Sequence, residues 1–259
     1  MSCLSLEKTT HLGKVKHIRV EGVMANRPVF IPNYGEGELV KIVGVEFKWH
    51  PGMAASQRQK SVVELHHSAI KNNYCKKPLE VSTKSTEELG IQLSAFNLSS
   101  VSLKQEKRFT VETAFQSSKV FERGGPYIDL LNKSSREAKQ DIRLKESGDL
   151  IGFKFFDVEW PLEPKTIFYD WLYINTLLKN VNLMDGLSEY DAFTDIEFNP
   201  KKSINCQAYS IALFKSLSYR GLVSDCIKDK NVFIDIVVNN GNRVSQEEGC
   251  VSPEQGQLF

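Results

Sequence analysis

The apolar residues of this chain come in short runs, and this feature most limits what the chain can fold into. Such runs end within about six residues or are interrupted by a charged residue, as Asp235 interrupts the segment 233–238, whereas a helix that crosses a bilayer needs about 20 apolar residues. The runs still add up to 41% hydrophobic residues in a chain of 259. This content is typical of a soluble globular protein and excludes collagen-like and largely disordered chains.

The spacing of the apolar residues predicts strands and helices that follow one another without a linker. Alternating or β-branched segments favour strands at 39–49, 150–156 and 193–198, and strands or loops at 79–82 and 91–98. Helical spacing favours helices at 56–70, 111–121, 134–146, 164–180 and 203–219. Because no repeat or composition break separates these elements, we expect a single helix-rich α+β domain with short strands over residues 24–238.

The two ends of the chain differ from this central part. We expect a flexible extension at residues 1–23, with either Met1 or Met24 as the native start. Residues 239–259 are rich in Asn, Gly, Ser, Gln and Glu, which indicates a disordered tail. The N-terminus is polar and basic where a secretory signal needs an apolar core, and the five cysteines are scattered. We therefore expect a cytoplasmic protein with free thiols.

The charge of the chain is nearly balanced, with a formal net charge of +1. Residues 1–110 hold 16 Lys and Arg against 10 Asp and Glu, whereas residues 111–259 hold 17 against 22. A protein that binds DNA through many phosphates is expected to be strongly basic, because Lys and Arg displace counterions from the backbone. If nucleic acid is a partner, we therefore expect a local contact.

Three polar residues share one side of the helix expected at 111–121. At about 100° per residue, Glu112, Gln116 and Lys119 fall within about 60° of one another, beside an apolar arc that includes Phe115. This pattern is typical of a cleft wall that offers a carboxylate, an amide and an amine. The alternative, which spacing alone favours, is a solvated helix face on which Glu112 and Lys119 pair.

Further carboxylates occur in the strand expected at 193–198 and in the helix expected at 164–180. The two-residue period of a strand sends Asp195 and Glu197 to the same side, about 7 Å apart, where they can orient a ribose or act in acid and base catalysis. The alternative is an edge strand with its polar side in water. Asp170 lies among aromatic residues, so it needs a partner, either a ligand hydroxyl or a structural hydrogen bond.

Two turns are candidate phosphate sites. Lys201 lies just before the helix expected from Ser203, and a helix N-terminus attracts anions. Gly124 and Gly125 end the helix expected at 111–121, and a phosphate-binding role there is the less favoured interpretation. The sequence contains no Walker A loop, dinucleotide fingerprint, Ser/His/Asp order or cluster of metal ligands. We therefore expect neither a metal nor a cofactor.

Longer segments of the sequence resemble the NADAR family. LSAFNL at 93–98 is followed by VETAFQSSKVF at 111–121, and the family pairs a Ser-x-Phe-like segment with a helix of the form Glu-x-x-x-Gln-x-x-Lys-Phe. Here one residue separates Lys119 from Phe121. The segments at 80–85, 161–173 and 191–208 are similar to the NADAR antitoxins that accompany DarT toxins. The resemblance extends over about residues 27–238.

This resemblance implies a substrate, a reaction and a set of residues. The DarT-associated branch removes ADP-ribose from guanine bases of DNA, so the implied reaction is hydrolysis of an N-glycosidic bond that reverses modification by a DarT-type toxin. The implied partners are therefore ADP-ribosylated DNA and that toxin, with no membrane. The implied catalytic residues are Glu112 as the acid, Lys119 as an imine-forming nucleophile, and Asp170. The residues implied to bind the ligand are Ser82, Lys84, Phe96, Asn97, Gln116, Gly124, Gly125, Trp171, Asp195, Glu197, Lys201, Asn205 and Gln207.

The sequence departs from the general family pattern after its late acidic residue. The family has a Trp-Gly pair there, whereas this chain has NPKKS at 199–203, so we expect a different pyrophosphate side of the pocket. Two other functions stay open at this point. One is a binding module that holds ADP-ribosylated DNA or the toxin without turnover, and the other is a metabolic N-glycosidase for a small ribosylated intermediate.

Overall fold

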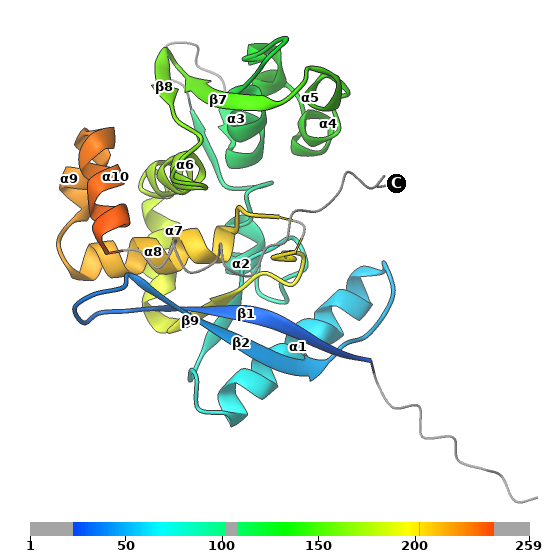
Figure 1. Cartoon of the computed structure of the whole chain (residues 1–259). Coiled ribbons are helices and arrows are strands. Elements are labelled where there is room, and N and C mark those ends of the chain that lie inside the picture. The colour runs from blue at the N-terminus through cyan, green and yellow to red at the C-terminus, as the bar shows by residue number, and fades with distance from the viewer. Residues whose placement is uncertain (1–22, 102–107, 202, 241–259) are drawn as a thin grey trace, which may run out of the picture.

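The computed structural model describes residues 23–101, 108–201 and 203–240 (Figure 1). The strands are β1 (Met24–Pro32), β2 (Val40–Lys48), β3 (Pro78–Glu80), β4 (Ser99–Val101), β5 (Arg108–Thr110), β6 (Lys119–Phe121), β7 (Leu150–Phe155), β8 (Val158–Trp160) and β9 (Ala192–Thr194). The α-helices are α1 (Ala55–Lys71), α2 (Glu88–Gln92), α3 (Val111–Ser117), α4 (Ser135–Lys139), α5 (Arg143–Glu146), α6 (Ile167–Leu177), α7 (Val181–Gly186), α8 (Gln207–Tyr219), α9 (Val223–Lys228) and α10 (Lys230–Asn239). This mixture confirms the predicted α+β class.

The largest sheet has the strand order β2-β1-β9-β3. The long strands β1 and β2 pair antiparallel from Met24 opposite Lys48 to Pro32 opposite Val40. The short strand β9 is antiparallel to β1 and parallel to β3, and two smaller sheets, β4-β5 and β6-β7-β8, complete the strands. Because parallel strands end at the same edge of a sheet, the segments after β3 and β9 lie together.

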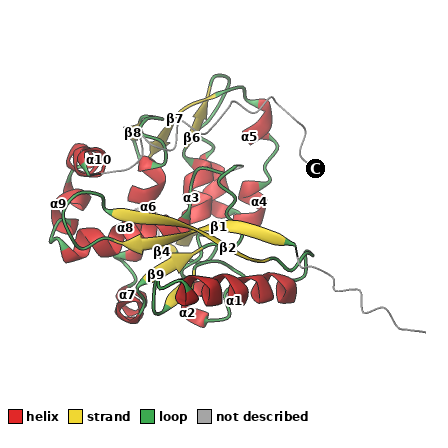
Figure 2. Ribbon diagram, turned by 60° about the horizontal axis from the view of Figure 1, so that its bottom comes forward, coloured by secondary structure: helices red, strands yellow, loops and turns green. Residues whose placement is uncertain are grey.

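Helices cover both faces of the large sheet (Figure 2). Successive strand residues point to opposite faces, so Val29 of β1 joins the buried cluster that contains Leu65 of α1. Its neighbour Phe30 faces the other way, where its ring centroid lies 5.8 Å from that of Tyr209 in α8. The sheet therefore separates α1 from the rest of the molecule.

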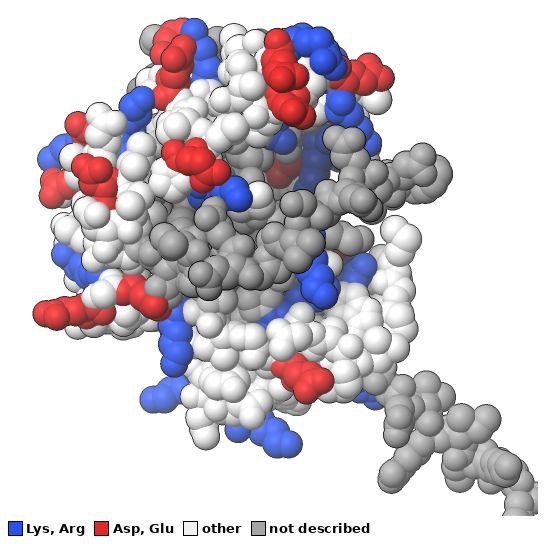
Figure 3. Space-filling view, viewed as in Figure 1, with Lys and Arg blue, Asp and Glu red and all other residues white. Residues whose placement is uncertain are grey.

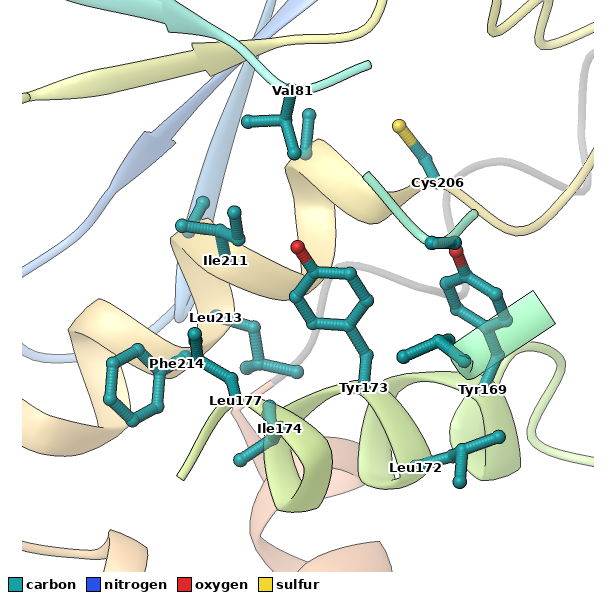
Figure 4. Close-up of a cluster of buried hydrophobic side chains, with 14 of the residues drawn as sticks. Val81, Tyr169, Leu172, Tyr173, Ile174, Leu177, Cys206, Ile211, Leu213 and Phe214 are labelled. Atoms are coloured by element: carbon teal, nitrogen blue, oxygen red, sulfur yellow. The ribbon is translucent and has the colours of Figure 1, made fainter. Parts of the chain in front are cut away.

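The main core lies between α6 and α8 (Figure 4). Helix α6 is apolar or aromatic nearly all round, which is typical of a helix buried inside a domain. Phe168 and Tyr173 of α6 are fully buried, and the Tyr173 hydroxyl donates to the Leu93 carbonyl oxygen at 2.5 Å. This bond satisfies the phenol inside the core and fixes the loop after α2 against α6.

Several elements lie close to where the sequence predicted them. The strand expected at 39–49 is β2, the strand expected at 150–156 is β7, and the helix expected at 56–70 is α1. The segment 79–82 begins in β3. The segment 91–98, expected as a strand or loop, starts in the last turn of α2 and continues as irregular backbone.

Two predicted helices are wrong in their extent. The helix expected at 111–121 ends at Ser117, because the hydroxyls of Ser117 and Ser118 donate to the Ala114 carbonyl and the chain then turns into β6. The helix expected at 134–146 is two short helices, α4 and α5. Asp141 lies between them and accepts the backbone N–H of Arg143 at 3.0 Å, which starts the second helix separately.

Three further boundaries also differ from the prediction. The strand expected at 193–198 ends at Thr194, because the Asp195 carboxylate accepts the following amides in a turn. The helix expected from Pro164 begins at Ile167, since Thr166 before it has a left-handed φ of 68°. The helix expected from Ser203 begins at Gln207 without a side-chain cap, and the Ser203 hydroxyl instead donates to the Asn205 carbonyl.

The predicted ends of the domain lie mostly outside the described residues. The extension expected at 1–23 falls there except for Val23, and the tail expected at 239–259 falls there from residue 241 onward. Asn239 is the last residue of α10, so the folded part ends later than predicted. Within the described ranges, no helix combines the length and the apolar character that a membrane span requires.

Candidate functional site

A cavity of about 630 Å³ lies between two walls of the molecule. In Figure 3 a hollow beside α3 and α4 shows blue atoms of Lys and Arg next to red atoms of Asp or Glu. One wall, here called the α3 wall, is built by α3, β6 and α4. The other, the β3/β9 wall, is built by the segments that follow β3 and β9. The cavity is lined by Ser82, Thr83, Lys84, Ser94, Ala95, Phe96, Glu112, Phe115, Gln116, Lys119, Arg136, Lys139, Gln140, Tyr169, Asp195, Glu197, Phe198, Ser203, Asn205 and Gln207.

Helix α3 brings a carboxylate and an amide to the cavity. The Thr110 hydroxyl caps the helix by accepting the backbone N–H of Thr113, and every residue of the helix is buried. Glu112 and Gln116 are one turn apart, and the Gln116 amide donates to Glu112 Oε1 at 2.9 Å. Both side chains are 6% exposed and both line the cavity, so this side of α3 faces an enclosed hollow and is not a solvated surface.

Lys119 reaches the same hollow from a different element. The sequence placed it on the helix with Glu112, but it is the first residue of β6. The turn after α3 still directs its amine inward, where Nζ lies 5.0 Å from the centroid of the Phe115 ring. Burial lowers the pKa of Lys119, the charge of Glu112 opposes this shift, and the charge of Lys139 adds to it. A buried amine of this kind is more readily deprotonated than an exposed one.

Helix α4 contributes the outer part of the α3 wall. Lys139 Nζ lies 3.9 Å from Glu112 Oε1 and 5.2 Å from the centroid of the Phe96 ring, while its side chain is 57% exposed. Arg136 and Gln140 lie on the same side of α4 and are exposed at the cavity mouth. Cations therefore lie toward the mouth, whereas Glu112 is buried behind them.

The β3/β9 wall holds Asp195 in a fixed orientation. Asp195 Oδ1 accepts the backbone N–H groups of Glu197 at 3.0 Å and Phe198 at 3.2 Å, and Oδ2 accepts the Gln207 amide at 3.0 Å. Gln207 Oε1 in turn accepts the backbone N–H of Ala95 at 2.6 Å. Asp195 and Glu197 lie in this turn and not along one strand, yet both line the cavity.

Glu80 is a buried carboxyl directly beneath this wall. It is 1% exposed and accepts hydrogen bonds from the hydroxyls of Ser82 at 2.6 Å and Thr194 at 2.7 Å and from the backbone N–H of Ile196 at 2.9 Å. Behind it, His66 Nε2 lies 2.8 Å from the Thr194 hydroxyl oxygen. Burial lowers the pKa of His66 to about 4, so this network contains no cation at neutral pH.

Both buried carboxyls of the β3/β9 wall have a raised affinity for protons. Burial, and then the charge of Glu80, raises the pKa of Asp195 to about 8. Burial raises the pKa of Glu80 as well, and the charge of Glu197 adds to that shift. Two carboxylates that are close together in a poorly solvated place do not both ionise readily. This pair of carboxyls therefore tends to keep a proton at neutral pH, and Asp195, with a pKa raised to about 8, is the member at the cavity.

The structure brings most of the sequence-predicted site residues to this cavity. Ten of them line it: Ser82, Lys84, Phe96, Glu112, Gln116, Lys119, Asp195, Glu197, Asn205 and Gln207. The remaining six do not line it: Asn97, Gly124, Gly125, Asp170, Trp171 and Lys201.

Asp170 is the predicted catalytic residue that lies away from the cavity lining. It is 1% exposed, and it accepts hydrogen bonds from the hydroxyls of Ser210 at 2.6 Å and Thr166 at 2.9 Å. These contacts join α6 to α8 behind the cavity. The structure thus provides the partner that a buried carboxylate requires from within the protein.

The other five residues have separate surroundings. Asn97 lines a second cavity of about 620 Å³ beside Arg108 and Lys179. Trp171 packs against Trp160, with 4.9 Å between ring centroids, and Lys201 is exposed. Gly124 pairs with Phe121 in the turn after β6, and Gly125 has a φ of +84° and lies so close to Lys119 that a Cβ would meet its carbonyl oxygen at 2.3 Å. The glycine pair therefore shapes the turn behind Lys119.

Several residues at the site were not expected from the sequence. Arg136, Lys139 and Gln140 line the cavity because α4 is a separate short helix, which the charge pattern alone did not reveal. Glu80 was quoted only within a longer segment, although a carboxylate between Leu79 and Val81 is the signal that marks a buried acid. Among the described residues, no group of three or more His, Cys, Asp or Glu is arranged to hold a metal ion.

The fold and the site together define an α+β protein with a polar cavity lined by carboxyls and a half-buried amine. The model of the DarT1-associated NADAR antitoxins matches residues 25–247, and the chain therefore belongs to this family. Its antitoxin role and its functional pairing with a DarT toxin follow from this membership. No curated protein matches the chain.

Proposed function

We propose that this chain is a hydrolase that removes ADP-ribose from guanine bases of DNA and so reverses modification by its DarT-type toxin. The observation that carries the proposal is the shared cavity of about 630 Å³, lined by Glu112, Lys119 and Asp195. Sites for small molecules typically measure about 300–1,000 Å³, a range suited to a nucleotide sugar. Membership of the antitoxin family supports ADP-ribose as that sugar.

Two buried polar atoms support a ligand rich in hydroxyl groups. Gln116 Oε1 and Ser94 Oγ are buried at the cavity and have no hydrogen-bond partner among the described residues. Buried polar groups are normally paired. Once a rotation of these side chains turns the two atoms toward the cavity, a ribose hydroxyl can donate to Gln116 and can donate to or accept from Ser94.

Cleavage of an N-glycosidic bond needs an acid for the departing base. The sequence assigned this role to Glu112, but Asp195 is the better candidate because its pKa is raised to about 8, so it holds a proton at neutral pH. The backbone and Gln207 contacts hold this carboxyl in position at the cavity. An acid that is oriented in advance with a pKa near the working pH transfers protons efficiently.

Lys119 is the proposed nucleophile. The Nζ lone pair forms a bond to the anomeric carbon of the ribose while the bond from that carbon to the guanine nitrogen breaks and leaves its electron pair on the guanine. Asp195 donates the proton that the guanine nitrogen takes up. The bond from the anomeric carbon to the ring oxygen then breaks as an imine forms between Nζ and that carbon, and the ring oxygen takes up a proton that Glu112 received from the amine. Water hydrolyses this imine to free ADP-ribose and the lysine amine.

Glu112 is the proposed acceptor for the protons that the Lys119 amine loses as it attacks and forms the imine. The two residues lie on the same cavity wall, and the charge of Glu112 acts on the pKa of Lys119. Gln116 and Lys139 hold the Glu112 carboxylate in place through contacts of 2.9 Å and 3.9 Å. The α3 wall thus supplies a nucleophile and its base, and the β3/β9 wall supplies the acid.

The test is incubation of the protein with a guanine-ADP-ribosylated oligonucleotide and measurement of released ADP-ribose. We expect release by the wild type and its loss in Lys119→Ala. Borohydride reduction during turnover should trap a covalent adduct on the wild type and none on Lys119→Arg, which keeps the positive charge but not the nucleophilic amine. Release without any trapped adduct would refute the covalent route while leaving the hydrolase assignment intact.

Two other outcomes would replace the proposal. Tight binding of the modified oligonucleotide without release of ADP-ribose would identify a binding module. Faster turnover of small ribosylated glycosides than of modified DNA would identify a metabolic N-glycosidase.

A further inference from the structure

Helix α4 presents a polar face to the mouth of the cavity, made of Arg136, Lys139 and Gln140 and here called the α4 face. All three side chains line the cavity and are exposed. They share one side of the helix because residues three and four positions apart are neighbours on a helix surface. The α4 face therefore lies where the cavity opens to solvent.

The orientation of the α4 face is fixed by contacts on the opposite side of the helix. Ser135 and Ala138 are buried, and the Ser135 hydroxyl donates to the Phe96 carbonyl at 2.9 Å and lies 2.8 Å from the Thr110 hydroxyl oxygen. The Ser134 hydroxyl accepts the backbone N–H of Glu137 in a capping box. These bonds hold α4 against the start of α3, so its cations stay at the cavity mouth.

The positive charge of Arg136 is not neutralised by an acidic side chain of the described residues. Arg143, only seven residues further on, makes short ion pairs with Asp129 at 2.7 Å and Asp141 at 2.8 Å. Arg136 forms no ion pair with a described residue and lies in the open. A guanidinium held at a cavity mouth without an acidic partner is well suited to a phosphate.

We propose that the α4 face binds the phosphodiester backbone of the DNA strand beside the modified guanine. This inference rests on the proposed function and adds how the polymeric part of the substrate is held. A cavity of about 630 Å³ accommodates a nucleotide sugar, so the flanking nucleotides must cross its mouth, where Arg136 lies. A local contact of this kind also suits a chain whose net charge is only +1.

The experiment compares two substrates and two charge-reversal variants. The substrates are a guanine-ADP-ribosylated single-stranded oligonucleotide and ADP-ribosylated guanosine, which lacks the DNA backbone. The variants are Arg136→Glu and the matched control Lys145→Glu, since Lys145 is also exposed on a short helix but does not line the cavity. We expect Arg136→Glu to raise KM for the oligonucleotide about tenfold and to flatten its salt dependence. Its KM for the nucleoside should rise much less than its KM for the oligonucleotide, and both KM values of the control should stay unchanged.

Each other result has a defined meaning. An equal loss on both substrates, or no loss on the oligonucleotide, would overturn the α4 face as a backbone contact. If the wild type hydrolyses neither substrate, the proposed function fails. Fluorescence anisotropy with an unmodified labelled oligonucleotide then decides the inference separately, because weaker binding by Arg136→Glu than by Lys145→Glu supports the contact and equal binding refutes it.

Discussion

The two walls of the cavity place carboxyl groups in opposite electrostatic surroundings. On the α3 wall, Glu112 has Lys139 within 3.9 Å and shares the cavity with Lys119. On the β3/β9 wall, the hydrogen bonds from described residues reach Glu80 from hydroxyls and a backbone amide, and they reach Asp195 from amides. The single cation there, among the residues that line the described cavity, is Lys84, whose Nζ lies 3.9 Å from Glu197.

This difference shows how one cavity can hold an acid and a base at the same pH. Cations favour the charged form of a carboxyl, whereas burial next to a second carboxyl favours the neutral form. In enzymes, two titratable groups whose surroundings move their pKa values apart commonly serve as the acid and the base. The four predictions below test this division between the walls, beginning with the α3 wall.

Lys119→Ala should have the largest effect. It removes the amine that the proposed reaction adds to the sugar, so we expect the rate of ADP-ribose release to fall by at least about 10⁴-fold. The measurement is single-turnover release from the modified oligonucleotide, with the melting temperature recorded to show that the variant folds. A loss of only a few fold would mean that the α3 wall supplies charge and not the nucleophile.

Glu112→Gln should follow, with a loss of about 10³-fold. The amide keeps the size of the side chain but accepts no proton from Lys119, and loss of a general base typically costs about 10²–10⁴-fold. The matched control is Lys139→Ala, which removes the cation beside Glu112 and keeps the carboxylate. An equal loss of activity in both variants would mean that the α3 wall depends on the ion pair between Glu112 and Lys139 and not on proton transfer to Glu112.

Asp195→Asn should cost about 10²-fold and should also change the pH dependence. Activity that needs protonated Asp195 is present below its pKa of about 8 and is lost above it, so the wild-type kcat/KM should fall on the alkaline side near pH 8. The Asp195→Asn variant should show no such fall in kcat/KM near pH 8. A wild-type profile that stays flat across pH 8 would contradict the assignment of the acid to the β3/β9 wall.

The same substitution has a consequence for stability with a definite sign. Asp195 binds its proton more tightly in the folded state, where its pKa is about 8 against a reference of 3.8. The unfolded state therefore loses the proton first, and stability falls as the pH rises from about 4 to about 8. Chemical denaturation across this range should show a shallower fall for Asp195→Asn than for the wild type.

Much of this division could not be read from the sequence. Helical spacing correctly grouped Glu112 with Gln116, because both lie on one turn of α3. Lys119 was assigned to the right cavity for the wrong reason, since the hydroxyls of Ser117 and Ser118 end the helix before it. Bonds between side chain and backbone at a helix end depend on local competition that apolar spacing does not report.

The β3/β9 wall was less visible still. It exists because β3 and β9 are parallel neighbours although they are far apart in the chain, and spacing within one segment carries no information about such pairing. Burial, and after it the charge of Glu80 from the other strand, raises the pKa of Asp195. By contrast, the long helix α1 and the long strand β2 have strong periodic patterns, and both were predicted closely.

Ser210→Ala should have the smallest effect on activity, because it acts behind both walls. The Ser210 hydroxyl donates to Asp170 Oδ1 at 2.6 Å, and loss of a donor to a buried carboxylate costs about 1–3 kcal/mol of stability. Since Asp170 joins α6 to α8 and does not line the cavity, kcat and KM should stay within about twofold of wild type. The matched control is Thr176→Val, whose buried hydroxyl on α6 donates to the neutral carbonyl of Leu172 at 2.8 Å.

We expect the control to cost less stability than Ser210→Ala, because hydrogen bonds to charged groups are worth more than those to neutral ones. The measurements are urea denaturation and steady-state kinetics on the modified oligonucleotide. A Ser210→Ala variant with wild-type stability but a loss of activity as large as that of Glu112→Gln would mean that Asp170 takes part in the reaction, as the sequence predicted. It would also mean that the chemistry extends beyond the two walls, since Asp170 does not line the cavity.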